Sequence, residues 1–151
     1  MARRISLRVE LAPDLPKVYG DRVQLQQVAL NLLMNACDAV EHQPDETRHI
    51  SLRTAVDDDS VLVSVTDHGD GLTEEQVRRA FEPFFTTRVN GMGLGLPICQ
   101  MIVDLHDGTL GAHGGAGHGM TFTFTLPALP SRATAAEPPA ARGDERVGLL
   151  S

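Results

Sequence analysis

The sequence predicts an α+β fold, a two-layer sandwich in which a mixed, mostly antiparallel sheet is covered on one face by three helices. Several segments alternate apolar and polar residues, as half-buried strands do. Three other segments repeat apolar residues at helical spacing. Hydrophobic residues make up 42% of the 151 residues, which is enough for a single core. The helices must therefore cover one face of the sheet.

The first element is a strand over residues 3–11. Its alternation places Ile5, Leu7 and Val9 on one face. The turn-rich "APDLP" and a brief extended segment, "KVYG", follow it.

A long helix is predicted from Val23 to about Val40. Asp21 and Gln24 form a capping box at its start, and "HQPDE" breaks the apolar pattern at its end. Two alternating segments follow, "HISLRTAV" and "SVLVSVTD", and the turn at residues 57–60 joins them. They predict a β-hairpin.

The second half of the chain supplies the remaining elements. Thr73 and Gln76 form a capping box for a short helix that ends near Phe81. A glycine-rich segment then leads into a third helix, which ends near Gly108. The strands "GTLGAHG" and "MTFTFTLP" complete the sheet.

Composition limits the domain, its partners and its compartment. We predict one domain over residues 1–127 and a disordered Pro- and Ala-rich tail over residues 128–151, which lacks periodicity. A net charge of -7 and the absence of Trp argue against nucleic acid as a partner. There is no membrane-length apolar run and no signal-peptide core, so we expect no direct membrane contact, although a parent protein could be anchored. Cys37 and Cys99 fall on apolar helical patterns and are predicted to be buried, reduced thiols, which fits the cytoplasm.

Common phosphate-binding motifs are excluded. The only lysine, Lys17, lies in a turn with no glycine loop before it, so a Walker A loop cannot form. Gly91, Gly93 and Gly95 are evenly spaced and do not have the Rossmann spacing. The histidines form no metal-binding helical pair and no serine lies in a nucleophile elbow, so metal-dependent and serine hydrolysis lack support.

An amide-rich stripe follows the long helix. Its members, at helical spacing, are Gln24, Gln27, Asn31, Asn35, Asp38 and His42. Asn is a poor residue inside a helix, so Asn31 and Asn35 four positions apart require a reason. An amide oxygen is a hard, neutral ligand, and Mg²⁺ takes only one or two protein oxygens besides phosphates and water. The stripe therefore indicates either a magnesium–nucleotide site or amides that bond only locally.

A buried carboxylate is predicted at the end of "VLVSVTD". Alternation places Asp67 on the same face as the valines of that strand. An adenine ring offers an amino group and apolar faces, which suit an acid at the mouth of an apolar pocket. Gly69 and Gly71 would let the backbone approach the ring. The alternative is that "DHGDG" is only a turn.

The glycine-rich segment predicts a polyphosphate site. Gly91, Gly93 and Gly95 precede a helix whose first turn accepts Pro97. Unpaired N–H groups at a helix start attract anions, and glycines permit a close approach.

The other end of this segment is aromatic. Phe81, Phe84 and Phe85 would anchor it, and Arg88 is the one cation inside it. The alternative for the phenylalanines is ordinary core packing.

Four segments in this order, "NLLMNACDAV", "DHGDGL", "FEPFFTT" and "GMGLGL", resemble the N, G1, F and G2 boxes of the catalytic ATP-binding domain of sensor histidine kinases. With the closing "GMTFTFTLP", the resemblance covers about residues 1–127. It implies the Bergerat-type α/β sandwich shared with the heat-shock chaperone ATPase, DNA gyrase and mismatch-repair ATPases. It also implies ATP and Mg²⁺ as ligands.

The resemblance assigns roles by position. It makes Asn35 the Mg²⁺ ligand, Asn31 its companion near the phosphates, and Asp67 the adenine-binding residue. It implies Thr121 as a minor adenine-side contact. The other implied ATP-binding residues are Gly69, Gly71, Phe84, Arg88, Gly91, Gly93, Leu94, Gly95 and Leu96.

Departures from the family pattern refine this expectation. Asp38 stands where many histidine kinases have a phosphate-contacting lysine, and the segment before Gly91 is short, as in the oxygen-, dicarboxylate- and nitrogen-sensing kinases. This moves the phosphate contact to Arg88. Hydrolysing relatives carry a glutamate base where Asn31 stands, and an amide cannot accept a proton. We therefore expect γ-phosphoryl transfer to a protein acceptor, with Asn31, Asn35 and Arg88 as the catalytic residues.

The phosphoacceptor is expected on another domain. None of the six histidines lies in the His-Glu context of a phosphoacceptor helix, and the chain begins where the preceding helical hairpin should end. The implied partners are a histidine-containing dimerisation domain, of the full-length parent or of a separate chain, and a downstream response regulator. A homodimer would form only through that hairpin. Two alternatives stay open, an anti-sigma-factor type serine kinase, against which the phenylalanine box argues, and a non-catalytic nucleotide-binding interaction module.

Overall fold

The computed structural model describes residues 4–82, 95–114 and 119–130. Its elements in chain order are β1 (Ser6–Glu10), α1 (Arg22–Ala39), a 3-10 turn (Asp45–Thr47), β2 (His49–Asp57), β3 (Ser60–Asp67), α2 (Glu74–Arg79), α3 (Gly95–Leu105), β4 (Thr109–Gly114) and β5 (Met120–Pro127). Within these residues the strands form one sheet in the order β1-β2-β3-β5-β4. Only the β1–β2 pair is parallel. The predicted α+β sandwich with a mixed, mostly antiparallel sheet is confirmed.

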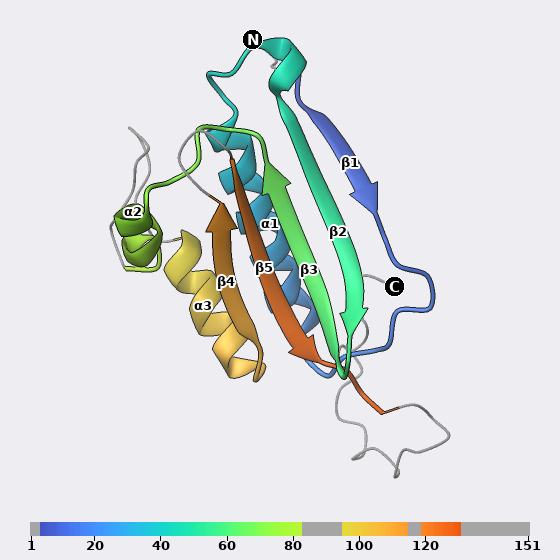
Figure 1. Cartoon of the computed structure of the whole chain (residues 1–151). Coiled ribbons are helices and arrows are strands. Elements are labelled where there is room, and N and C mark those ends of the chain that lie inside the picture. The colour runs from blue at the N-terminus through green and yellow to red at the C-terminus, as the bar shows by residue number, and fades with distance from the viewer. Residues whose placement is uncertain (1–3, 83–94, 115–118, 131–151) are drawn as a thin grey trace.

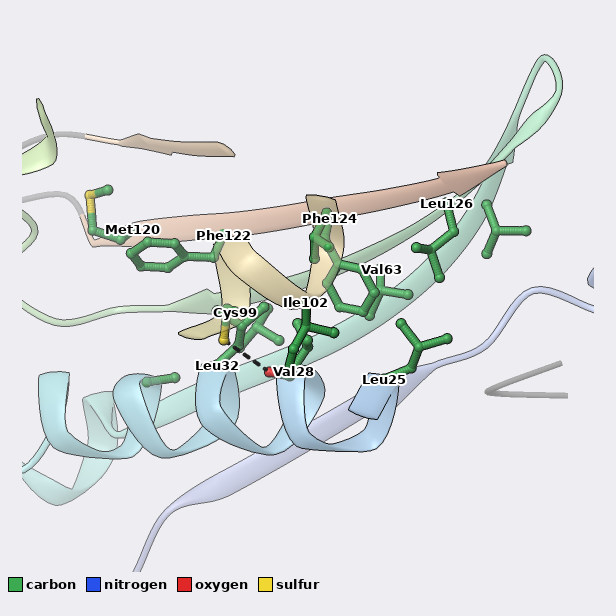
Figure 2. Close-up of a cluster of buried hydrophobic side chains, with 14 of the residues drawn as sticks. Leu25, Val28, Leu32, Val63, Cys99, Ile102, Met120, Phe122, Phe124 and Leu126 are labelled. Carbon is green, nitrogen blue, oxygen red and sulfur yellow. Dashed lines mark hydrogen bonds between the residues drawn. The ribbon is translucent and has the colours of Figure 1, made fainter. Parts of the chain in front are cut away.

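The core lies between the sheet and the helices. Figure 1 shows α1 behind the sheet and α3 beside β4, and the β5 side chains point toward α1 in Figure 2. Every second residue of β3 and β5 is buried, as alternation requires for a sheet covered on one face. Phe124, Leu25 and Leu32 are fully buried. Each such side chain contributes about 1.5–3 kcal/mol on burial, so α1 is held firmly against the sheet.

One predicted apolar face joins the core only through Ile5, which is partly buried against it. β1 is a strand as expected, but Leu7 is 53% exposed and Val9 is 49% exposed. β1 forms the edge of the sheet beyond β2, where the helix layer does not cover it. Alternation predicts which residues share a face, and it does not predict whether a helix reaches that face.

The start of α1 is joined to the end of α3. The Asp21 carboxylate caps α1 by accepting from the N–H groups of Val23 and Gln24 at 2.9 and 3.2 Å. The backbone N–H of Asp21, which the predicted capping box assigns to Gln24, instead donates to Nε2 of His106 at 3.0 Å. The other ring nitrogen of His106 donates to the Ile102 carbonyl at 2.7 Å. The second predicted capping box, Thr73 with Gln76 at α2, is confirmed with both of its bonds present.

The chain stays attached to the sheet just past β5. Ala128 pairs with Val18, and the N–H of Leu129 donates to the Lys17 carbonyl at 2.8 Å. Residues 131–151 lie outside the described residues, so the domain boundary after residue 127 stays a prediction. Cys37 is half-buried, Cys99 is buried, and neither forms a disulfide bond within the described residues. No helix in the described part of the chain is both long and apolar enough to cross a bilayer.

Candidate functional site

Asp67 ends β3 with its side chain turned toward the helix layer. It is only 4% exposed, and it shares a face with Val61, Val63 and Val65 as predicted. Its Oδ1 accepts from the N–H of Gly69 at 2.8 Å. Burial raises the pKa of Asp67 above its ordinary value of 3.8, although backbone hydrogen bonds from Gly69 and Met120 and the nearby His68 lower it.

The carboxylate has unused acceptor capacity. An ionised carboxylate offers about four lone-pair sites, and the backbone donors of Gly69 and Met120 occupy two of them. A buried charge is stabilised by further donors. A ligand amino group, such as the one on adenine, fits this requirement, whereas a carbonyl oxygen does not.

The loop after Asp67 is fixed to the end of α1. A Cβ on Gly69 would lie 2.3 Å from the carbonyl oxygen of Ala39, so no larger residue fits without movement. Gln43 donates to Asp70 at 2.9 Å across the same gap, and Gly71 has a φ of 75°. The glycines were expected to admit a ring. The structure shows a second reason for glycine at position 69. The backbone of this loop passes so close to the backbone at the end of α1 that a side chain would not fit.

In the amide stripe of α1, Asn31 and Asn35 differ in their hydrogen bonding. Asn31 bonds locally, because Gln27 Nε2 donates to its Oδ1 at 2.8 Å. Asn35 is half-buried and has no side-chain hydrogen bond within the described ranges. Asn35 lies one turn before Ala39, on the same helix face, and Ala39 contacts the loop after Asp67. The unpaired amide of Asn35 therefore lies on the face of α1 that leads to Asp67.

The start of α3 lies at the same end of the molecule. α3 runs antiparallel to α1, since Cys99 contacts Val28 and His106 contacts Asp21. Gly95, one turn before Cys99, is the first residue of the helix and has open space where a Cβ would stand. The N–H groups of this helix start, which have no partner within the helix itself, thus point toward the Asn35 end of α1. Leu96 is half-buried against the core.

The aromatic segment is described only in part. Phe81 packs edge-on against Phe122 with ring centroids 6.4 Å apart, so core packing, the alternative reading, applies to this residue. Five predicted site residues lie outside the described residues: Phe84, Arg88, Gly91, Gly93 and Leu94.

The structure does not bring Thr121 together with Asp67. Thr121 pairs across the sheet with Thr66, and their hydroxyl oxygens lie 3.0 Å apart on the face opposite the helices. The β5 residue beside Asp67 is Met120, which is 4% exposed and whose backbone N–H helps to lower the pKa of the carboxyl group. Sequence reasoning missed Met120. The signal was available, because alternation in "MTFTFTLP" places Met120 with the buried phenylalanines and Thr121 on the other face.

A metal ion at this site would have few protein ligands. No group of three or more His, Cys, Asp or Glu side chains in the described ranges could hold a metal ion. The half-buried, unpaired amide of Asn35 fits a cation that takes one protein oxygen and completes its shell with phosphate oxygens and water, as Mg²⁺ does.

The raised pKa of Asp67 predicts a pH-dependent stability difference. An acid with a raised pKa binds its proton more tightly when folded, so its cost to stability grows as pH rises from 3.8 through the raised pKa and is fully present above it. Asp67→Asn removes this titration. Relative to the parent, the variant should therefore gain stability as pH rises from below 4 toward neutral. Urea unfolding of both proteins across this range measures the difference, and a constant difference would contradict the prediction.

Comparison with known proteins gives a consistent result. Residues 20–130 match the family described as histidine kinase-, DNA gyrase B-, and HSP90-like ATPase. The sensor protein FixL of Bradyrhizobium diazoefficiens is 40% identical over 126 residues, which are 83% of this chain and 25% of that protein. The C4-dicarboxylate transport sensor protein DctS of Rhodobacter capsulatus is 36% identical over 124 residues, 82% of this chain and 19% of that protein. The chain thus spans about a quarter or less of the length of these two relatives.

Solved structures agree in fold. The catalytic domain of histidine kinase ThkA superposes with a TM-score of 0.69 at 33% identity, covering 82% of this chain and 79% of that domain. Full-length ShkA, solved in complex with AMPPNP, gives a TM-score of 0.69 at 31% identity and covers 85% of this chain and 27% of that protein.

Proposed function

Because the chain belongs to the family of histidine kinase-, DNA gyrase B- and HSP90-like ATPases, we propose that it binds Mg-ATP and transfers the γ-phosphoryl group to a histidine on a separate domain in two-component signalling. One observation carries most of this proposal. The buried carboxylate of Asp67 has spare acceptor capacity, and the amide of Asn35, which has no partner among the described residues, lies on the helix face that leads to it.

Each residue has a distinct role in the proposal. Asp67 accepts the amino group of adenine at the base end of the site. Asn35 supplies one amide oxygen to Mg²⁺, which when bound offsets the negative charge of the phosphates. The N–H groups at the start of α3, beginning with Gly95, bind phosphate oxygens. Arg88 and the remaining predicted ATP-binding residues, which lie outside the described residues, complete the triphosphate site.

The proposal favours transfer over hydrolysis. Asn31 stands where a general base would be needed to activate water, and a neutral amide cannot take up a proton. Its oxygen already accepts from Gln27. The site can position phosphates and stabilise developing charge, and these are the main requirements for moving a phosphoryl group to a nucleophile supplied from outside.

The partners follow from this chemistry. We place the acceptor histidine on a dimerisation domain of the full-length parent or of a separate chain, and we place a response regulator after it. The reaction would occur in the cytoplasm, where ATP is available.

The proposal is tested with labelled ATP and a histidine-bearing helical hairpin from a related sensor kinase. We expect the hairpin to acquire a phosphate that is labile in acid and stable in alkali, while the chain alone retains none. An acid-stable phosphoserine would favour a serine kinase. Tight ATP binding with no transfer to any hairpin would favour a non-catalytic binding module.

Replacing Asn35, the proposed magnesium ligand, should weaken Mg²⁺-dependent nucleotide binding without unfolding the protein. Asn35→Ala should weaken nucleotide binding in the presence of Mg²⁺ by about tenfold or more, and binding in EDTA much less. The helix should remain folded, since Ala has the higher helix propensity. Calorimetry with and without Mg²⁺ measures the effect.

The matched control is Met34→Ala. Met34 is the preceding residue of α1 and is 55% exposed, so its loss alters the same turn without touching the stripe. Equal Mg²⁺ dependence in the Asn35 variant and in the parent would rule out Asn35 as the ligand.

A further inference from the structure

The side chain of Asn31 lies beside two residues for which the proposed function has no role. Gln27, one turn earlier on α1, donates through Nε2 to Asn31 Oδ1 at 2.8 Å. The Asn31 side chain also lies beside the thiol of Cys99 on α3, close enough to lower the pKa of that thiol. Cys99 is fully buried, and its Sγ donates to the Val28 carbonyl at a distance of 3.8 Å, the bond drawn in Figure 2.

These contacts are compatible with one orientation of the Asn31 amide. A thiol carries a single proton, and the S–H of Cys99 points to the Val28 carbonyl. With its proton there, the sulfur is left as an acceptor, and Asn31 lowers the thiol pKa as a donor would, so the NH₂ end of the amide is favoured to face α3. Burial raises the pKa of the Cys99 thiol to about 11, which keeps this proton in place at neutral pH.

The hydrogen bond from Gln27 favours the same orientation of the Asn31 amide. Its NH₂ group donates to the oxygen end of Asn31. If the Asn31 amide turned over, its NH₂ would meet the NH₂ of Gln27, and its carbonyl oxygen would meet the sulfur lone pairs. The hydrogen bond from Gln27 would be lost, and the Cys99 S–H would have to leave Val28 to meet the oxygen.

We propose that Gln27 and Cys99 are positioning residues that fix the Asn31 amide with its oxygen turned away from α3, so that it is oriented before the nucleotide binds. The inference rests on the proposed function, in which Asn31 lies near the phosphates. Groups that need no reorientation at the moment of reaction contribute most to transfer. One lone pair of the Asn31 oxygen and one of its N–H groups remain for the ligand.

The first test uses Gln27→Met, which keeps the length of the side chain and removes both amide groups. Gln27 is exposed, so the fold should be unaffected. The matched control is Gln26→Met, because Gln26 is also exposed, adjoins Gln27 on α1 and lies off the stripe. We expect Gln27→Met to lower the rate of phosphoryl transfer to the hairpin about three- to tenfold, with a smaller change in ATP KM, and Gln26→Met to leave both unchanged.

The second test uses a pair of variants of equal size. Ser in place of Cys99 keeps a donor for Val28 and an acceptor for Asn31, whereas Ala keeps neither. We expect Cys99→Ser to retain several-fold more transfer than Cys99→Ala, each normalised to the folded fraction. Equal rates for the two would overturn the role of Cys99.

A readout without nucleotide separates this inference from the proposed function. The side-chain NH₂ signals of Asn31 in ¹H–¹⁵N NMR, identified by their loss in Asn31→Asp, should shift in Gln27→Met and Cys99→Ala but not in Gln26→Met. Unshifted signals would overturn the positioning. A parent chain that shows these shifts in its variants yet binds no Mg-ATP would overturn the proposed function alone.

Discussion

ATP should bind this chain about tenfold to a few hundredfold more tightly than GTP, and Asp67→Asn should narrow that ratio. The buried carboxylate of Asp67 can only accept hydrogen bonds, so it pairs with the 6-amino group of adenine. Guanine presents an oxygen at that place, which would leave two acceptors facing each other. An amide at position 67 keeps one acceptor and adds a donor that can meet the guanine oxygen. ATP affinity should therefore fall while GTP affinity falls less or rises.

Displacement of a fluorescent ATP analogue by each nucleotide measures both ratios. Asp70→Asn is the matched control, since it makes the same change of charge three residues later, on an exposed side chain of the same loop. The control should keep the preference of the parent. Equal binding of ATP and GTP by the parent, or an undiminished preference in Asp67→Asn, would show that Asp67 does not read the base.

The fold was predictable wherever a local sequence pattern determined the structure of a segment. Alternation located all five strands, because burial on one sheet face imposes a period of two. Capping residues located the starts of α1 and α2, since Asp21 and Thr73 satisfy the first N–H groups of these helices. The misses arose from partners distant in sequence. The bond between Asp21 and His106 spans 85 positions, and no local pattern identifies it.

The sequence predicted the residues of the candidate site better than it predicted the contacts between them. Asp67 lies at the strand end and is buried as alternation requires. Asn31 and Asn35 lie on one helix face, yet only the structure reveals that Asn31 accepts from Gln27 and lies beside Cys99, while Asn35 is unpaired within the described ranges. Thr121 was assigned from its place in a motif, and strand alternation places it on the opposite face of the sheet. The roles of Arg88 and of the glycines before α3 stay predictions.

The second large effect is expected from adding one methyl group to the loop after Asp67. In Gly69→Ala the new Cβ would lie 2.3 Å from the backbone oxygen of Ala39, so the loop must move away from α1. Overpacking of this kind costs about 1–3 kcal/mol of unfolding free energy. The movement should also weaken the bond from the Gly69 N–H to Asp67 Oδ1, which is 2.8 Å in the parent. The carboxylate would then lose a donor and its fixed orientation, so ATP affinity should fall together with stability.

Gly111→Ala is the matched control. Gly111 lies in β4 with nothing within 4 Å of its Cβ position, and neither Gly111 nor Gly69 has a positive φ. In a strand, Ala in place of Gly should be neutral or stabilise by about 0.5–1 kcal/mol, because Gly loses more backbone entropy on folding. Urea unfolding and ATP titration of the two variants separate a clash from a general effect of removing glycine. If Gly69→Ala were as stable as Gly111→Ala and bound ATP like the parent, the loop would have room to move, and the contact with Ala39 would not hold Asp67 in place.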